Sequence, residues 1–183
     1  EKLIEANLCG SRVIVWSKEN SIKLYSMGYY GKPVNIDKPK SISEINTYLE
    51  LSLLEANYLV EKGIIIVKDN NRVLTREELF EFSKKHYRLF KELYEVYKDL
   101  REKGYIVRSG LKFGANFAVY KYGPGIDHAP FIVHVIPNSA EIDPIEIIRA
   151  GRLSHTVRKK FILATLDEIH KKVVYFMFDW WKA

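Results

Sequence analysis

Three side chains with complementary acid–base chemistry lie in the second half of this sequence. Tyr120 carries a phenol hydroxyl, His128 an imidazole that exchanges a proton near neutral pH, and Lys159 a persistent positive charge. Cleaving RNA without a metal needs three matching groups: a base for the 2′-hydroxyl, an acid for the departing 5′-oxygen, and a cation beside the phosphorus. These residue types fit that chemistry, and by themselves leave open whether Tyr120 or His128 is the base.

The stretch "YKYGPGIDHAP" sets the first two of these residues on one loop. Tyr120 ends a predicted strand, glycines and a proline follow, and His128 lies just before the next predicted strand. Loops between strands are favoured places for reactive groups. We therefore expect the phenol and the imidazole to face the same site.

The third residue belongs to "HTVRKKFILATL", where three consecutive cations precede an apolar run. Asp143 and Pro144 predict the start of a helix that continues to about residue 160. On that helix Arg152 and Lys159 are seven apart and share a face, with the cations at the end that the helix dipole favours. A solvated helix end explains such a charge run by itself, so the case for a site depends on the loop residues.

The elements around these residues are strand-rich after Gly104 and mixed before it. Apolar runs predict strands at 12–17, 22–27 and 64–67, and helical spacing predicts a helix that ends at Gly63. Thr75 and Glu78 form a capping-box pattern, and the apolar stripe after them predicts one long helix over about 76–103.

This order of elements predicts an α/β (α+β) chain of two domains. We expect a small N-terminal α/β domain over 1–84 and a C-terminal domain over 85–183, joined by the long helix. The C-terminal domain should hold a mixed sheet with packed helices, because strand patterns at 105–135 and 161–181 flank a single helical pattern.

Composition narrows the class of protein further. The 183 residues carry a net charge of +6 with a pI near 9.2, which suits a polyanionic partner such as nucleic acid. No apolar run approaches the roughly 20 residues that span a bilayer, and no signal-type pattern opens the sequence. We expect a cytoplasmic protein with no membrane association.

We expect neither a metal nor another cofactor. The one cysteine, Cys9, rules out a zinc site built from several thiolates. His128 and His134 lack a well-spaced third ligand. The acidic residues Asp127, Asp143 and Glu146 do not form the paired-carboxylate pattern of a magnesium-dependent nuclease.

Three motifs resemble one known family. "GLKFGANFAVYKYG", the histidine of "IDHAPFIVHVIP", and "GRLSHTVRKKFILA" are similar to the C-terminal catalytic domain of archaeal tRNA-splicing endonucleases. The resemblance covers the chain from about Tyr105 onward, and extends more loosely into the N-terminal part through "LSLLEANYLVEKG". Tyr120, His128 and Lys159 fall on the catalytic Tyr, His and Lys of the family.

The resemblance implies an activity as well as a nuclease-like fold. The family's substrate is precursor tRNA with a bulge-helix-bulge at the intron boundaries, and its products are a 2′,3′-cyclic phosphate and a 5′-hydroxyl. It implies that Tyr120 acts as general base, His128 as general acid and Lys159 as the cation at the transition state. The breadth of intron substrates stays open.

The family also holds an extruded bulge base between two side chains. The arginine of that pair matches Arg152, and its partner is expected among the tryptophans of "FDWWK". Trp180 is the first choice and Trp181 the second, as a face on which the base could stack. Alternation along the last strand sends neighbours to opposite faces, so one of the two tryptophans is expected to be a core residue.

Family members act as dimers or tetramers, so we expect an oligomer. An acidic loop before the last strand joins subunits in the family, whereas here "LDEIHKKV" follows two acids with two lysines. This departure predicts a hetero-tetramer of two such chains with two structural paralogue subunits, although a homo-oligomer stays open. The alternative function is a noncatalytic RNA-binding or structural subunit of the same complex.

Overall fold

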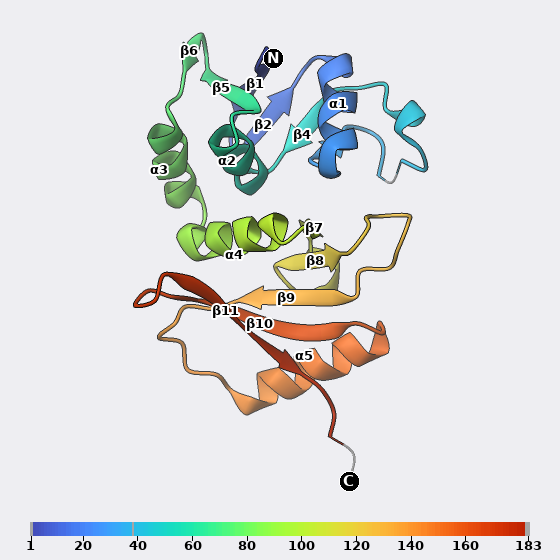
Figure 1. Ribbon diagram of the computed structural model, residues 1–183, viewed down its shortest axis with the longest axis vertical. Coiled ribbons are helices and arrows are strands. Elements are labelled where there is room, and N and C mark those ends of the chain that lie inside the picture. Colours follow the sequence, from blue (N-terminus) through green and yellow to red (C-terminus); the bar gives the residue numbers. More distant parts are fainter. Residues whose placement is uncertain (1, 38, 182–183) are drawn as a thin grey trace. The chain divides into compact units, whose positions relative to one another are not determined.

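The computed structural model describes residues 2–37 and 39–181. The chain divides into two compact units, residues 1–90 and 91–183, which are described separately (Figure 1). The domain boundary predicted after residue 84 falls within the last helix of the first unit.

The first unit contains a six-stranded sheet in the order β3-β4-β2-β1-β5-β6 within the described residues. Strands β1 and β5 are parallel, and the other pairs are antiparallel. The elements are β1 (Ile4–Cys9), β2 (Arg12–Val15), α1 (Lys18–Gly28), β3 (Lys32–Pro33), a 3-10 turn (Ile42–Glu44), β4 (Leu49–Leu51), α2 (Leu53–Glu61), β5 (Ile65–Asp69), β6 (Arg72–Val73) and α3 (Arg76–His86).

The strand predicted over 22–27 is wrong, because these residues belong to α1. Ser17 caps this helix: its hydroxyl accepts the N–H of Asn20 at 3.2 Å. The apolar residues of the segment are spaced for one helix face as well as for a strand. The buried positions of α1 follow the helical period, at Ser21, Leu24, Tyr25 and Gly28.

The predicted long helix over 76–103 is two helices, α3 and α4 (Phe90–Glu102). Thr75 caps α3 as predicted, accepting the N–H of Glu78 at 3.1 Å. The chain then turns at Leu89, whose φ is 61°. The Phe90 ring packs edge-on against Phe80 with centroids 5.5 Å apart. A straight helix would separate these residues by about 15 Å, so this contact requires the break.

The second unit contains a five-stranded mixed sheet, in the order β11-β10-β9-β8-β7 within the described range. Only β9 and β10 are parallel neighbours. Helices α4 and α5 lie on opposite faces of this sheet (Figure 1). Besides α4, its elements are β7 (Ile106–Ser109), a 3-10 turn (Leu111–Phe113), β8 (Phe117–Tyr120), β9 (Phe131–Val135), α5 (Pro144–Thr156), β10 (Lys160–Asp167) and β11 (Lys172–Phe178).

Strand alternation gives the sheet two different faces. On the α4 side, the Phe117 ring packs against Tyr97 with centroids 6.0 Å apart. On the α5 side, Ala115, Ile132, Phe161 and Leu163 form a buried cluster. Helix α5 begins as predicted, with Asp143 accepting the N–H of Ile145 at 2.9 Å. In the described ranges, none of the helices has the length and apolar character needed to cross a membrane.

Candidate active site

The sheet register brings the three predicted catalytic segments to one edge. Val119 pairs with Phe131, so the end of β8 lies beside the start of β9. Lys160 also pairs with Phe131, so β10 starts at the same edge. Tyr120 follows the first of these positions and Lys159 precedes the last. The topology therefore gathers segments that lie far apart in the sequence.

The loop between β8 and β9 is closed by one carboxylate. Asp127 accepts the backbone N–H groups of Lys121, Tyr122 and Gly123, at 3.0, 3.2 and 2.7 Å respectively. Several such bonds to one carboxylate hold a loop firmly. His128 follows directly and is exposed. The imidazole thus starts from a fixed backbone position and remains open to a ligand.

Helix α5 stops before Lys159 is reached. Arg158 adopts a left-handed conformation with φ of 57°, and its N–H donates to His155 O at 3.0 Å. The N–H of Lys159 donates to Ser154 O at 2.8 Å. This bond pair is the Schellman termination of a helix. The prediction that Arg152 and Lys159 share a helix face is wrong for this reason.

Two neutral groups hold the Lys159 side chain instead. Its ammonium donates to the carbonyl oxygen of Ala129 at 2.6 Å and lies 5.0 Å from the centroid of the Phe113 ring. Ala129 is the residue after His128, so the ammonium is fixed beside the imidazole segment. Partial burial lowers the Lys159 pKa, Lys112 lowers it further, and Asp127 opposes both.

The neighbouring cation has a different partner. The Lys160 ammonium forms an ion pair with Asp179 at 2.6 Å, at the end of β11. Of these two adjacent lysines, only Lys160 is neutralised by a carboxylate. Lys159 forms no ion pair with a carboxylate within the described residues, so its charge is available to an anionic ligand.

Tyr120 is half-buried, and burial raises the pKa of its phenol. The positive charge of Arg108 works against this rise, and the negative charge of Asp127 adds to it. The free protein therefore keeps the phenol protonated at neutral pH. A base role for Tyr120 requires loss of that proton, which the positive charge of Arg108 favours and burial opposes.

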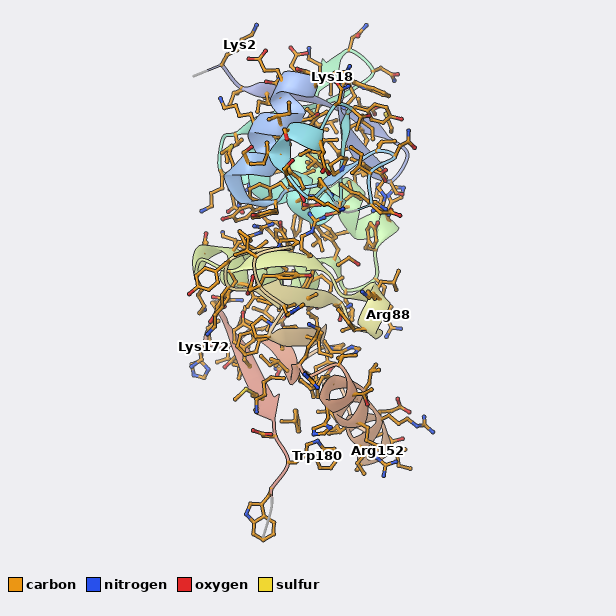
Figure 2. All side chains as sticks on the ribbon, turned by 90° about the vertical axis from the view of Figure 1, so that its right-hand side faces the viewer. Lys2, Lys18, Arg88, Arg152, Lys172 and Trp180 are labelled. Atoms are coloured by element: carbon orange, nitrogen blue, oxygen red, sulfur yellow. The ribbon has the colours of Figure 1, made fainter. Side chains whose placement is uncertain are left out.

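The two residues predicted to hold a base lie on the α5 side of the sheet. The indole of Trp180 lies 3.7 Å from where a side chain on Gly151 would begin, and Gly151 adjoins Arg152. Figure 2 shows Arg152 on α5 and Trp180 beside that helix. Trp180 is 52% exposed, whereas Trp181 is 87% exposed. An open groove of about 660 Å³ is lined by both Lys159 and Trp180.

The residues considered as metal ligands have other surroundings. His134 packs against the Phe161 ring with centroids 5.6 Å apart, and burial lowers its pKa. Asp127 shapes the loop and Asp143 caps α5. Throughout residues 2–37 and 39–181, no three His, Cys, Asp or Glu side chains gather as a metal site.

Three residues near the site did not stand out in the sequence. Lys112 and Phe113 come from a turn before β8, and Arg108 comes from β7. The only sequence signal for Lys112 and Phe113 was "GLKFG", where two glycines enclose a cation and an aromatic ring, and Arg108 had no such signal. The ring's contact with Lys159 depends on tertiary folding, which spacing along the chain does not reveal.

The whole chain matches known proteins. Residues 4–80 match the model of the tRNA intron endonuclease N-terminal domain, and residues 90–175 match that of its catalytic C-terminal domain. Relatives named tRNA-splicing endonuclease from Saccharolobus islandicus and Saccharolobus solfataricus are each 48% identical over 181 residues, covering 98% of this chain and 100% of theirs. One from Hyperthermus butylicus is 47% identical, covering 98% of this chain and 99% of its own.

These matches confirm the resemblance drawn from the three motifs, and the two mixed sheets with their helices confirm the α/β fold class. The matches to known proteins support the activity of an endonuclease that cleaves tRNA introns. The chain belongs to the tRNA intron endonuclease family.

Proposed function

We propose that this chain excises introns from precursor tRNA by cutting at a bulge-helix-bulge without a metal. The observation that carries the proposal is the common edge of β8, β9 and β10, where Lys159 is bonded to the residue after His128. None of the three proposed catalytic side chains is sealed in the interior. Each is therefore accessible to a phosphodiester at that edge.

The proposed reaction is an internal transfer. Tyr120, in its phenolate form, takes the proton of the 2′-hydroxyl and becomes the neutral phenol, and the freed 2′-oxygen forms a bond to phosphorus. The bond from phosphorus to the 5′-oxygen breaks as His128 gives that oxygen a proton. Lys159 stabilises the extra negative charge on the phosphoryl oxygens. The products are a 2′,3′-cyclic phosphate and a 5′-hydroxyl, and no water or metal enters the cutting step.

Lys159 suits its role because only part of its donor capacity is used. An ammonium has three N–H donors, and the carbonyl of Ala129 accepts one of them. The ring of Phe113 attracts the charge without neutralising it. The remaining donors can meet a phosphoryl oxygen in the transition state.

Arg152 and Trp180 are proposed to hold a bulged base. The groove along α5 runs from Lys159 to Trp180, so a strand cut at Lys159 could place an extruded base against the indole. Stacking on an aromatic face suits any base, and a guanidinium can cover the opposite side.

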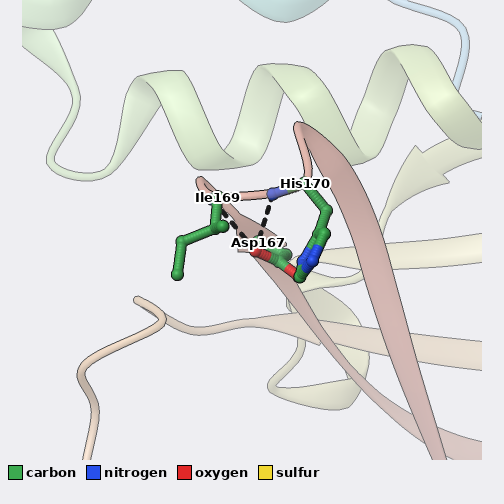
Figure 3. A network of polar contacts seen from close by, with 3 residues as sticks. All are labelled: Asp167, Ile169 and His170. Carbon is green, nitrogen blue, oxygen red and sulfur yellow. Dashed lines mark hydrogen bonds and ion pairs between the residues drawn. The ribbon is translucent and has the colours of Figure 1, made fainter.

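The active assembly is proposed to be a hetero-tetramer with two structural paralogue subunits. Both acids of the hairpin between β10 and β11 already have partners in their own chain, and Figure 3 shows those of Asp167. Asp167 binds the His170 ring at 2.7 Å, and Glu168 lies 3.4 Å from Lys91. The carboxylates of such a hairpin are already engaged within the chain, which makes them less available to a neighbouring subunit. Light scattering with a paralogue present should show a complex, whereas full activity of the purified chain alone would contradict the proposal.

A cleavage assay on bulge-helix-bulge RNA in EDTA tests the function. We expect cutting at both junctions by the assembled enzyme, with cyclic phosphate and 5′-hydroxyl ends identified by mass spectrometry. His128→Ala should abolish most cutting while RNA binding persists, and His86→Ala, which alters an exposed histidine of α3, is the matched control. If His128→Ala retains full cutting, the cleavage does not depend on this site, and the chain would then be a noncatalytic RNA-binding or structural subunit.

A further inference from the structure

The turn "GLKFG" before β8 has a fixed shape. Its first residue, Gly110, passes so close to β8 that a Cβ there would lie 2.7 Å from the backbone carbon of Phe117. The carbonyl of Gly110 accepts the N–H groups of Phe113 and Ala115 at 2.8 and 3.0 Å. The turn therefore presents the residues between its two glycines in one defined place.

Those residues set two ammonium groups on one aromatic ring. Lys112 Nζ lies 5.5 Å from the centroid of Phe113, and Lys159 Nζ lies 5.0 Å from the same centroid. Like charges this close repel each other, and the ring's attraction offsets only part of that cost. In the part of the chain that the structure describes, no carboxylate forms an ion pair with Lys112.

Lys112 is exposed, whereas Lys159 is half-buried. Because Lys159 is the more buried of the two, it is the lysine that would contact the reacting phosphate within the site. The exposed Lys112 side chain can instead contact an RNA strand that enters the site from solvent. A nucleic-acid backbone supplies a separate phosphate to each of two adjacent cations.

We propose that Lys112 binds a backbone phosphate of the RNA beside the one that is cleaved, with Phe113 holding both lysines. This inference rests on the proposed function and adds a substrate-binding residue to it. Binding of that neighbouring phosphate would relieve the repulsion between the two ammonium groups. It would also set the register of the strand, so that the scissile phosphate lies at Lys159.

The test measures binding of a bulge-helix-bulge RNA whose 2′-hydroxyl at each cleavage site is replaced by hydrogen, so that it cannot be cut. Lys112→Met, Lys112→Arg and wild-type assemblies are compared over a range of salt. Lys172→Met is the matched control, an exposed lysine at the opposite end of the sheet. Neutral methylphosphonate linkages are then placed one at a time around each cut.

We expect Lys112→Met to bind roughly fivefold more weakly, the size of one exposed ion pair. Its slope of log affinity against log salt should fall by about 0.7–0.9. Lys112→Arg should restore both values. One methylphosphonate next to the cleaved bond should weaken the wild type but leave Lys112→Met unchanged, which is the coupling that a double-mutant cycle detects.

The proposal is overturned if Lys112→Met matches Lys172→Met in affinity and salt slope, or if every methylphosphonate weakens wild type and Lys112→Met equally. Cleavage of the all-ribose RNA by wild type separates this failure from failure of the proposed function. Absence of that cleavage rejects the endonuclease role, whereas cleavage without any coupling to Lys112 rejects this inference alone.

Discussion

The two ends of the C-terminal sheet treat charge in opposite ways. At the hairpin end, Asp167 pairs with His170 and Glu168 with Lys91. At the end where β8 stops and β10 starts, Lys159 is held by a carbonyl and a ring, and Lys112 faces solvent. Charges matched within the chain stabilise a local shape. A cation held by neutral groups keeps its attraction for an external anion.

Lys159 and Lys160 show the same difference between paired and unpaired charge within one chain segment. Lys160 is neutralised by Asp179, while Lys159 next to it is not. Their difference arises from their places in the chain: Lys159 follows the turn that ends α5 and its ammonium reaches the Ala129 carbonyl, whereas Lys160 begins β10 beside the end of β11, where Asp179 lies. A run of cations before a strand can thus contain one structural and one functional residue.

The largest effect should come from removing the unneutralised charge. Lys159→Ala should lower the single-turnover cleavage rate about 10²- to 10³-fold, the range seen when one transition-state donor is lost. Lys160→Ala removes an equal charge one residue away and should change the rate little. Equal losses in both variants would mean that general charge, and not the position of Lys159, supports cutting.

The next effect concerns the groove along α5. Trp180→Ala should weaken RNA binding by about 1–3 kcal/mol, the usual contribution of one stacked base. Trp181→Ala is the control, because that indole is 87% exposed. An RNA with an abasic bulge should bind wild type and Trp180→Ala alike. A larger loss in Trp181→Ala would assign the stacking to the second indole.

A smaller effect is expected from the acidity of Tyr120. Burial raises its phenol pKa, so at neutral pH the phenolate is a small fraction that grows about tenfold with each pH unit. Difluorotyrosine at this position lowers the phenol pKa. If Tyr120 is the base, the single-turnover rate at neutral pH should rise a few fold and the alkaline limb should move to lower pH.

Difluorotyrosine at position 122 is the control for fluorination, since Tyr122 is exposed on the same loop. An unchanged rate profile with difluorotyrosine at position 120 would remove Tyr120 from proton transfer. The base would then have to be sought at His128, the other candidate that the residue types allow.

The smallest effect is expected at the hairpin end, where Asp167 bonds His170. The Asp167 pKa is lowered chiefly by its hydrogen bond to the His170 side chain. A lowered pKa contributes stability above the unfolded value, and this contribution is lost as pH falls through the folded value. Asp167→Asn should therefore melt slightly earlier than wild type at pH 6, and the difference should shrink as pH falls below the ordinary Asp pKa of about 3.9. Cleavage by the assembled enzyme should be unchanged.

Much of the fold could be predicted from local pattern. The strands of the second unit, the Asp143 cap and the Thr75 cap were all predicted, because alternation and capping act within a few residues. The helix break at Leu89 could not be predicted, because it depends on ring packing between Phe80 and Phe90. An apolar stripe shows which residues share a face but not whether the helix continues.

The site shows the same division. Tyr120, His128 and Lys159 drew attention through residue type and loop position. Their approach to one edge follows from the parallel pairing of β9 with β10, which no local pattern specifies. The helix end at Arg158 was hidden because a non-glycine residue adopts the left-handed conformation there.

The most direct test of the central claim is a structure of the assembled enzyme with uncleavable 2′-deoxy bulge-helix-bulge RNA. The account predicts the Tyr120 hydroxyl next to the 2′ position, the His128 ring near the 5′-oxygen and the Lys159 ammonium against a phosphoryl oxygen, all at one phosphodiester. Placement of these three groups on different phosphates, or of the cut site away from the edge where β8, β9 and β10 meet, would contradict it.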